Sequence, residues 1–151
     1  IGEKNSSADF TTGRDYGISF YKVAPSIIYQ PNTKFRISLN GRYEDKKNDD
    51  AFGGETAVVR DLGVQFKFNQ AEKGSLQGEV KAINITFDGV QNNAIAFEML
   101  ESLRPGTNFT WNLGYQRNLS ENLQISIQYN GRKSEENDPI HAGGVEVRAF
   151  F

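Results

Sequence analysis

The chain has 151 residues, of which 17 are lysine or arginine and 19 are aspartate or glutamate, so its formal net charge at pH 7 is -2. Both signs are spread along the sequence, which argues against a nucleic-acid surface. No run approaches the ~20 apolar residues of a membrane-spanning helix, and without cysteine the chain has neither disulfides nor a thiolate metal site.

Residues 1–14 are polar and predict a loop or linker, and residues 15–30 predict the first strand. Side chains alternate between the two faces of a strand, so residues of one parity share a face. Pro25 has no amide to donate to a ladder, which predicts an edge or a bulge there. The apolar residues also change parity midway, which predicts a bulge; the two sets are Tyr16, Ile18 and Phe20, then Tyr21, Val23, Ile27 and Tyr29.

The next segments alternate cleanly and are separated by a long charged stretch. A turn at Pro31-Asn32 precedes the strand at 34–43, residues 44–56 predict a charged loop, and residues 57–69 predict the following strand. In both strands apolar residues oppose charged or polar ones. A row of cations would be costly in a dry core and is ordinary on a wet face.

The middle of the chain contains one more strand and the least strand-like segment. Residues 76–87 predict a strand whose apolar residues change parity between Ala82 and Ile83. Within residues 88–108, the stretch 94–103 contains good helix formers ahead of Arg104-Pro105-Gly106, which favours a short helix in a loop over extended structure.

The last three strands are predicted at 109–115, 122–132 and 144–151, each with one apolar and one polar face. Connection lengths alternate along the chain, with short turns near 31–32, 72–73 and 120–121 and long loops at 44–56, 88–108 and 133–143. Bacterial outer-membrane barrels have short periplasmic turns and longer extracellular loops. If the C-terminus lies in the periplasm, every short turn falls on the periplasmic side.

These patterns predict an all-β fold, an antiparallel transmembrane β-barrel segment of about seven strands at residues 15–151, with one short helix in a loop. Single-chain bacterial barrels have an even number of strands. Seven strands therefore predict either one more strand within residues 1–14 or further strands in sequence outside these residues. The abrupt start at Ile1, without an initiator Met or a signal-peptide core, favours the second alternative and a processed or excised piece.

In a barrel of this kind, each strand side chain faces either the lipid or the water-filled lumen. Alternation predicts that the lipid-facing or interfacial girdle residues are Phe35, Ile37, Leu39, Tyr43, Leu62, Val64, Phe66, Phe68, Phe109, Trp111, Leu113, Tyr115, Leu123, Ile125, Ile127, Tyr129, Val145, Val147 and Phe151. It predicts that the lumen-facing residues are Arg36, Arg42, Lys67, Gln124, Gln128, Arg132, Glu146 and Arg148. Three more charged residues extend the candidate lumen set, namely Glu79, Lys81 and Arg117.

Residues 94–151 resemble the C-terminal barrel ends of large Bacteroidota outer-membrane proteins. The resemblance is carried by Trp111, the strand exit Asn130-Gly131-Arg132-Lys133-Ser134-Glu135, His141 and the closing Val147-Arg148-Ala149-Phe150-Phe151. Such barrels occur in transporters, in type 9 secretion translocons and in proteins of unknown role. The resemblance implies an outer-membrane location, contact with membrane lipid, and recognition of the last strand by barrel-assembly machinery. It also implies the rest of a larger barrel or partner subunits.

The sequence predicts no catalytic residue, metal site or cofactor. His141 is the only histidine, so a Ser-His-Asp triad would have to include it, and its loop position favours a structural or incidental role. Two acidic groups, Asp45/Asp49/Asp50 and Glu135/Glu136/Asp138, lack the EF-hand pattern, which favours solvated loop charge. The charged lumen set is compatible with a charge-selective pore or a socket for a plug, but mixed-sign salt bridging is favoured.

The function predicted from these features is a non-enzymatic barrel wall that serves transport, protein secretion or surface-complex assembly. The main alternative is a soluble β-sandwich, such as a carbohydrate-binding module of a secreted protein, whose aromatic side chains would stack on sugars. An enzyme is the third alternative, and it would require carboxylates that converge in space.

Overall fold

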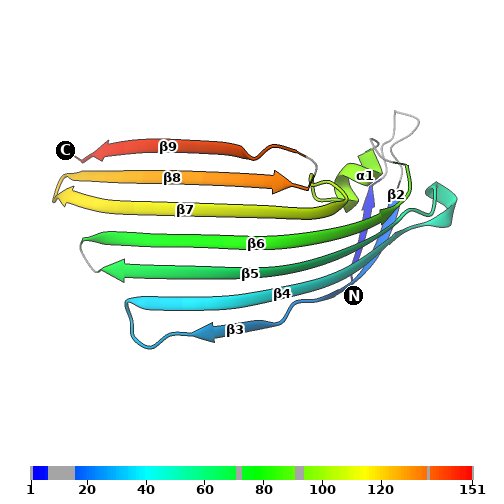
Figure 1. The fold of residues 1–151 in the computed structure, drawn as a ribbon, viewed down its shortest axis with the longest axis horizontal. Helices are drawn as coiled ribbons and strands as arrows, with labels where there is room; N and C mark the ends of the chain where they lie inside the picture. The colour runs from blue at the N-terminus through cyan, green and yellow to red at the C-terminus, as the bar shows by residue number, and fades with distance from the viewer. Residues whose placement is uncertain (1, 7–15, 71–72, 91–93, 136, 151) are drawn as a thin grey trace.

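The computed structural model describes residues 2–6, 16–70, 73–90, 94–135 and 137–150, which form one antiparallel sheet and two short helices (Figure 1). The strands are β1 (Gly2–Ser6), β2 (Tyr16–Val23), β3 (Ser26–Tyr29), β4 (Phe35–Asn48), β5 (Thr56–Gln70), β6 (Gly74–Asp88), β7 (Gly106–Ser120), β8 (Leu123–Ser134) and β9 (Ile140–Ala149). A 3₁₀ turn, η1 (Asp50–Phe52), follows β4, and the helix α1 (Ala94–Met99) lies between β6 and β7.

The sheet is a meander in which consecutive strands pair. Its order is β1-β2-β4-β5-β6-β7-β8-β9, and β3 pairs with β4 beyond the end of β2. The predicted all-β antiparallel architecture is therefore confirmed, and so is the short helix within residues 88–108. Among the described residues the sheet is open, because β1 and β9 stand at opposite ends of the strand order and do not pair with each other.

Connection lengths alternate as the sequence predicts. The connections at 30–34, 71–73 and 121–122 lie at one end of the sheet, which we call the turn end, and the connections at 49–55, 89–105 and 135–139 lie at the other, the loop end (Figure 1). All three long connections are shorter than predicted, because the strands continue into them. The predicted charged loop at 44–56 is wrong in its first half, since β4 runs through Asn48.

Nine strands are described, two more than the seven predicted. One additional strand is β1, which pairs with β2 and lies within the stretch 1–14. A loop is predicted there, with one more strand as the less favoured alternative, and β1 agrees with that alternative; residues 7–14 lie outside the described residues. The other arises because the segment 15–30 is split in two. The ladder breaks at Ala24-Pro25, and the Gly41 amide donates to the Pro25 carbonyl across a distance of 2.9 Å. The predicted irregularity at Pro25 is thus confirmed, on a strand at the edge of β4.

The bulge predicted at the first parity change, Phe20/Tyr21, is wrong, and the parity change at Ala82/Ile83 involves no bulge either. Within the described residues the ladders β2–β4 and β5–β6 run without a register shift, and the one recorded shift lies between Asn118 and Ser120 of β7. The parity changes instead because apolar side chains move from one face of the sheet to the other along a regular strand.

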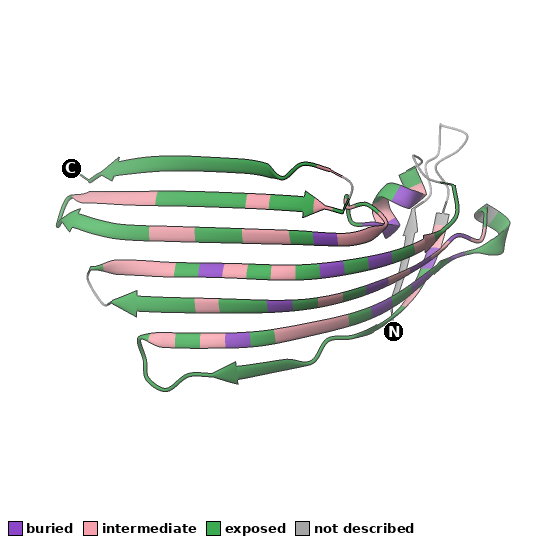
Figure 2. Cartoon of the chain, in the orientation of Figure 1, coloured by how far each residue is buried: buried purple, intermediate pink, exposed green. Residues whose placement is uncertain are grey.

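The dry core is small and lies at the loop end. There α1 covers one face of the sheet, and Ala96, Met99 and Leu100 are buried against residues of β2, β5 and β6; Figure 2 shows the buried residues gathered toward this end. The sheet residues of this core are Ile18, Ala57, Val59, Ile83 and Ile85. No helix in the described part of the chain is long and apolar enough to cross a membrane.

Candidate functional site: the two faces of the sheet

One face of the sheet, here called the apolar face, is covered by hydrophobic side chains from β3 to β9. Register pairing places them in rows across the strands, for example Leu39 with Val64 and Val64 with Val80. These residues are not buried by any other part of the described structure: Val80 lies on a central strand and is 57% exposed. A patch that runs across a whole sheet is far larger than scattered surface hydrophobics, and such patches mark contact with a partner or a lipid phase.

The opposite face, here called the polar face, is hydrophilic over the turn half of the sheet. Cross-strand partners there are Ser38 with Gln65, Gln65 with Glu79, and Glu79 with Asn112. The same pattern continues onto β8 and β9, where Gln124 pairs with Arg148. A soluble sandwich has one buried and one wet face, whereas this sheet has one wet face and one that is apolar and uncovered.

The polarity of the two faces inverts toward the loop end. On β6 the apolar residues lie on the apolar face through Ala82, and from Ile83 onward they lie on the polar face beneath α1. The same change occurs between Val59 and Leu62 on β5 and between Phe20 and Tyr21 on β2. Toward the loop end of the change on β5 and β6, apart from Tyr21 and Val58, the apolar face carries mostly polar or charged side chains, among them Asp45, Lys47, Arg60, Asn84 and Thr86.

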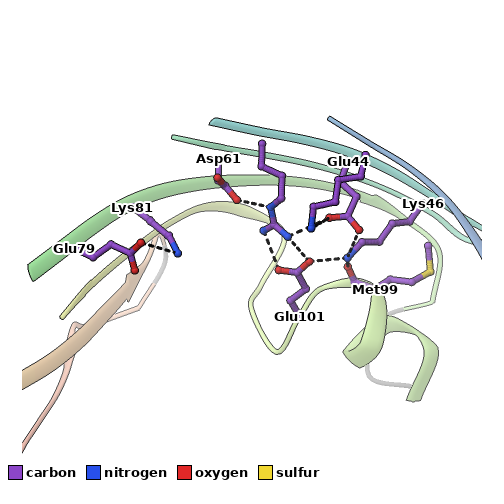
Figure 3. A network of polar contacts seen from close by, with 9 residues as sticks. Glu44, Lys46, Asp61, Glu79, Lys81, Met99 and Glu101 are labelled. Carbon is purple, nitrogen blue, oxygen red and sulfur yellow. Dashed lines mark hydrogen bonds and ion pairs between the residues drawn. The ribbon is translucent and has the colours of Figure 1, made fainter. Parts of the chain in front are cut away.

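An ionic cluster attaches the segment after α1 to the polar face at the level of the inversion. Figure 3 shows Glu101 extending from this segment toward Glu44, Lys46 and Asp61 on the strands. Arg42 donates two hydrogen bonds to the Glu101 carboxylate, at 2.7 and 2.9 Å, and Lys46 donates a third at 2.8 Å. Arg42 also donates to Asp61 and Glu44, so its charge is matched on both sides of the contact.

This cluster explains why polar residues at the start of the predicted loop 44–56 are strand residues. Glu44 and Lys46 are 6% and 7% exposed, and both are paired. Lys46 also donates to the Met99 carbonyl at 3.2 Å, which satisfies an acceptor at the end of α1. Burial of an ion is tolerated when its partners are in place, so strand β4 continues where composition alone predicts solvent.

The Glu101 carboxylate is held in its charged form. Burial alone would raise the pKa of this carboxyl, but the hydrogen bonds from Arg42 and Lys46 lower the pKa to about 2. Glu101 and Ser102 both adopt positive φ, 55° and 63°. The left-handed region costs a non-glycine residue about 1–2 kcal/mol, and here the ion pairs and the packing of α1 hold the chain in it.

Aromatic residues gather on the apolar face of β7, β8 and β9. The Tyr129 hydroxyl and His141 Nδ1 are hydrogen-bonded at 2.8 Å, and the two rings are stacked with centroids 5.9 Å apart. The Trp111 ring also lies close to His141, with a centroid distance of 5.7 Å and an interplanar angle of 52°. His141 is therefore the second residue of β9 and not a loop residue, and its contacts are those of a packed aromatic group.

Register places the predicted lipid-facing residues together on the apolar face, except Phe151, which lies outside the described residues. It places the eight predicted lumen-facing residues together on the polar face. Arg117 is the exception among the additional charged residues, because it pairs with Ile125 on the apolar face near the turn end. Glu101 and Lys46 are not among the site residues predicted from the sequence. The two residues are 55 positions apart, and opposite charge alone does not indicate that two such distant residues are in contact.

No group of three or more potential metal ligands is gathered among the described residues. The described cavities are open and lie on the polar face or at the ends of the sheet. One of them, of about 230 Å³, lies beneath α1 beside Glu44 and Lys46.

Comparison of the chain with protein-family models, with curated proteins and with solved structures found no match. The two faces of the sheet are therefore the features from which a function can be inferred.

Proposed function

We propose that this chain forms part of the wall of an outer-membrane β-barrel, with its apolar face toward lipid and its polar face toward a water-filled interior. Its role would be non-enzymatic and would serve transport, protein secretion or the assembly of a surface complex. The observation that carries the proposal is the uncovered apolar face together with the inversion of polarity toward the loop end of β2, β5 and β6.

The energetics favour an apolar medium on this face. Transfer of a large aliphatic or aromatic side chain out of water contributes about 1.5–3 kcal/mol, and exposed examples occur on every strand from β4 to β9: Leu39, Leu62, Val80, Leu113, Ile127 and Val145. Polar interior and apolar exterior faces are the arrangement of membrane barrels. A soluble sandwich would instead keep the same face apolar along the whole strand.

The apolar band extends about 20–26 Å along the strands, from Phe35 to Gly41 on β4 and from Leu123 to Gly131 on β8, at ~3.3 Å per residue. Because barrel strands are tilted by about 35–45°, this length corresponds to a height of about 15–20 Å, which approaches the height of about 25 Å of the apolar band of outer-membrane barrels. Between this band and the loop end, the apolar face carries polar residues and α1 covers the polar face. This change is expected where the strands leave the lipid.

The two sheet edges require partners in this proposal. Lipid offers no hydrogen bonds to backbone groups, so a spanning sheet has to be closed. Further strands, from the rest of a larger barrel or from partner subunits, would pair with β9 and with the β1/β3 edge. Barrel-assembly machinery would engage the last strand, as the resemblance to Bacteroidota barrel ends implies.

The single tryptophan provides a test. Trp111 lies on the apolar face, in the part of the apolar band nearer the loop end. With the chain reconstituted in phosphatidylcholine vesicles, we expect brominated lipid to quench its fluorescence and aqueous iodide to have little effect. A monodisperse monomer in detergent-free buffer, with no quenching by brominated lipid, would refute the membrane proposal and favour the soluble sandwich.

A further inference from the structure

Two cations at the turn end of the polar face lie directly opposite each other. Arg36 of β4 and Lys67 of β5 are register partners on the same face, and both are exposed. Neither takes part in an ion pair with any other described residue. Like charges at directly opposed positions of a sheet are destabilising, so this pair is unfavourable unless an anion lies between the two side chains.

A cavity opens at this pair. It has a volume of about 240 Å³ and is lined by Arg36, Ser38, Gln65, Phe66, Lys67 and Gln77, none of which is acidic. The nearest acidic neighbour in register is Glu79, opposite Gln65, and its carboxylate is already paired with Lys81 at 3.1 Å and accepts from Asn112 at 3.2 Å. The lining thus offers a guanidinium, an ammonium and side-chain amides as donors, with no internal counter-charge.

Several other cations of the polar face are paired. Arg42 and Lys46 are matched by Asp61, Glu44 and Glu101, and Arg148 is paired with Glu146. The mixed-sign salt bridging that the sequence favours therefore describes these cations and Lys81, which is paired with Glu79, and the Arg36–Lys67 pair departs from it.

We propose that Arg36 and Lys67 form a binding site for a phosphate group, either inorganic phosphate or a small phosphate monoester. A guanidinium presents two parallel donors to such an oxyanion, and the ammonium adds a second positive charge. A phosphate monoester carries close to two negative charges at pH 7, which matches two adjacent cations better than a single carboxylate does. The site follows from the geometry of the polar face and does not require that the other face contacts lipid.

Titration calorimetry of the full chain with inorganic phosphate, in non-ionic detergent at low ionic strength, tests the proposal. We expect saturable binding that is weakened about tenfold or more in both Arg36→Gln and Lys67→Gln, because each loses a charge-assisted hydrogen bond, and that is retained in Lys67→Arg. The matched control is Arg132→Gln, which removes from β8 one exposed cation of the same face that forms no ion pair with another described residue and should change the affinity less than twofold. Circular dichroism verifies that each variant keeps its strand content.

Absence of saturation by about 10 mM phosphate, or equal weakening in Arg132→Gln and Lys67→Gln, would overturn the site, the second result indicating an effect of net charge alone. A further arm repeats the titration with phosphatidic acid in the micelles. Competition would identify a lipid headgroup as the source of the phosphate, and undiminished binding would identify a soluble ligand. Failure of the vesicle quenching test leaves these outcomes unchanged, so the two proposals fail separately.

Discussion

The indole ring of Trp111 lies against Gly131, its register partner on the neighbouring strand, and reaches across it to the ring of His141. A Cβ atom added at Gly131 would overlap the indole. The same relationship recurs between Phe66 and Gly78 on β5 and β6. At Gly131 and at Gly78, glycine on the apolar face is therefore a position over which a cross-strand aromatic ring lies, a pairing that fixes register.

Substitution of Gly131 by alanine should destabilise the sheet by about 1–3 kcal/mol, because the indole must leave its position beside His141. Gly144→Ala is the control, since no atom lies within 4 Å of an added Cβ there, and we expect it to be neutral or slightly stabilising. Urea unfolding followed by circular dichroism measures both. Equal midpoints for the two variants would show that the Trp111–Gly131 contact contributes nothing to stability.

Replacement of Glu101 by glutamine should release the segment that contains α1. The variant loses the negative charge of the group that accepts hydrogen bonds from Arg42 and Lys46. Hydrogen bonds to charged groups contribute about 1.5–3 kcal/mol each. We expect hydrogen exchange of the amides at 96–103 to become at least tenfold faster, with little change in the centre of β7 and β8. Glu121→Gln, in the exposed β7–β8 turn, is the charge-matched control, and unchanged exchange in Glu101→Gln would contradict the role given to the cluster.

The lowered pKa of Glu101 predicts that the folded chain loses stability in acid. The pKa of Glu101 is lowered from 4.5 to about 2, so its contribution is complete above about pH 4.5 and is lost as the pH falls through about 2. A shift of this size corresponds to about 3 kcal/mol, but the side chain is 35% exposed, and screening reduces the expected effect to about 1 kcal/mol.

Denaturant unfolding at pH 6 and pH 2.5 measures this contribution as the difference between the wild-type chain and Glu101→Gln. The wild-type chain should lose more stability on acidification than the variant does. Parallel losses in the two proteins would mean that the paired Glu101 does not govern acid sensitivity.

The inversion of polarity can be tested with two single cysteines on β6, since the chain has none of its own. Val80 and Thr86 lie on the same face and both are exposed, one within the apolar band and one beyond it. In vesicles, a membrane-impermeant maleimide should label Thr86→Cys and leave Val80→Cys unlabelled. Detergent-denatured protein, in which both should react fully, is the control; equal labelling in vesicles would place both positions in water.

Much of this architecture was predictable from alternation alone. The strict parity of β4, β7 and β8 predicted which of their residues share a face, because the period of a strand is two residues whatever surrounds it. The order of short and long connections was also visible, because turn-forming residues act locally. Which medium contacts the apolar face stays a prediction.

Contacts between distant segments could be decided only by the tertiary structure. The parity change at Phe20/Tyr21 predicts a bulge when the strand is considered separately; the structure shows a regular strand whose apolar side chains move onto the face that α1 covers, as they also do at Ala82/Ile83. Likewise, Glu44 and Lys46 resemble loop residues until Glu101 is brought against them. Local composition determines which residues can form a strand, whereas burial of charge depends on partners that only folding brings together.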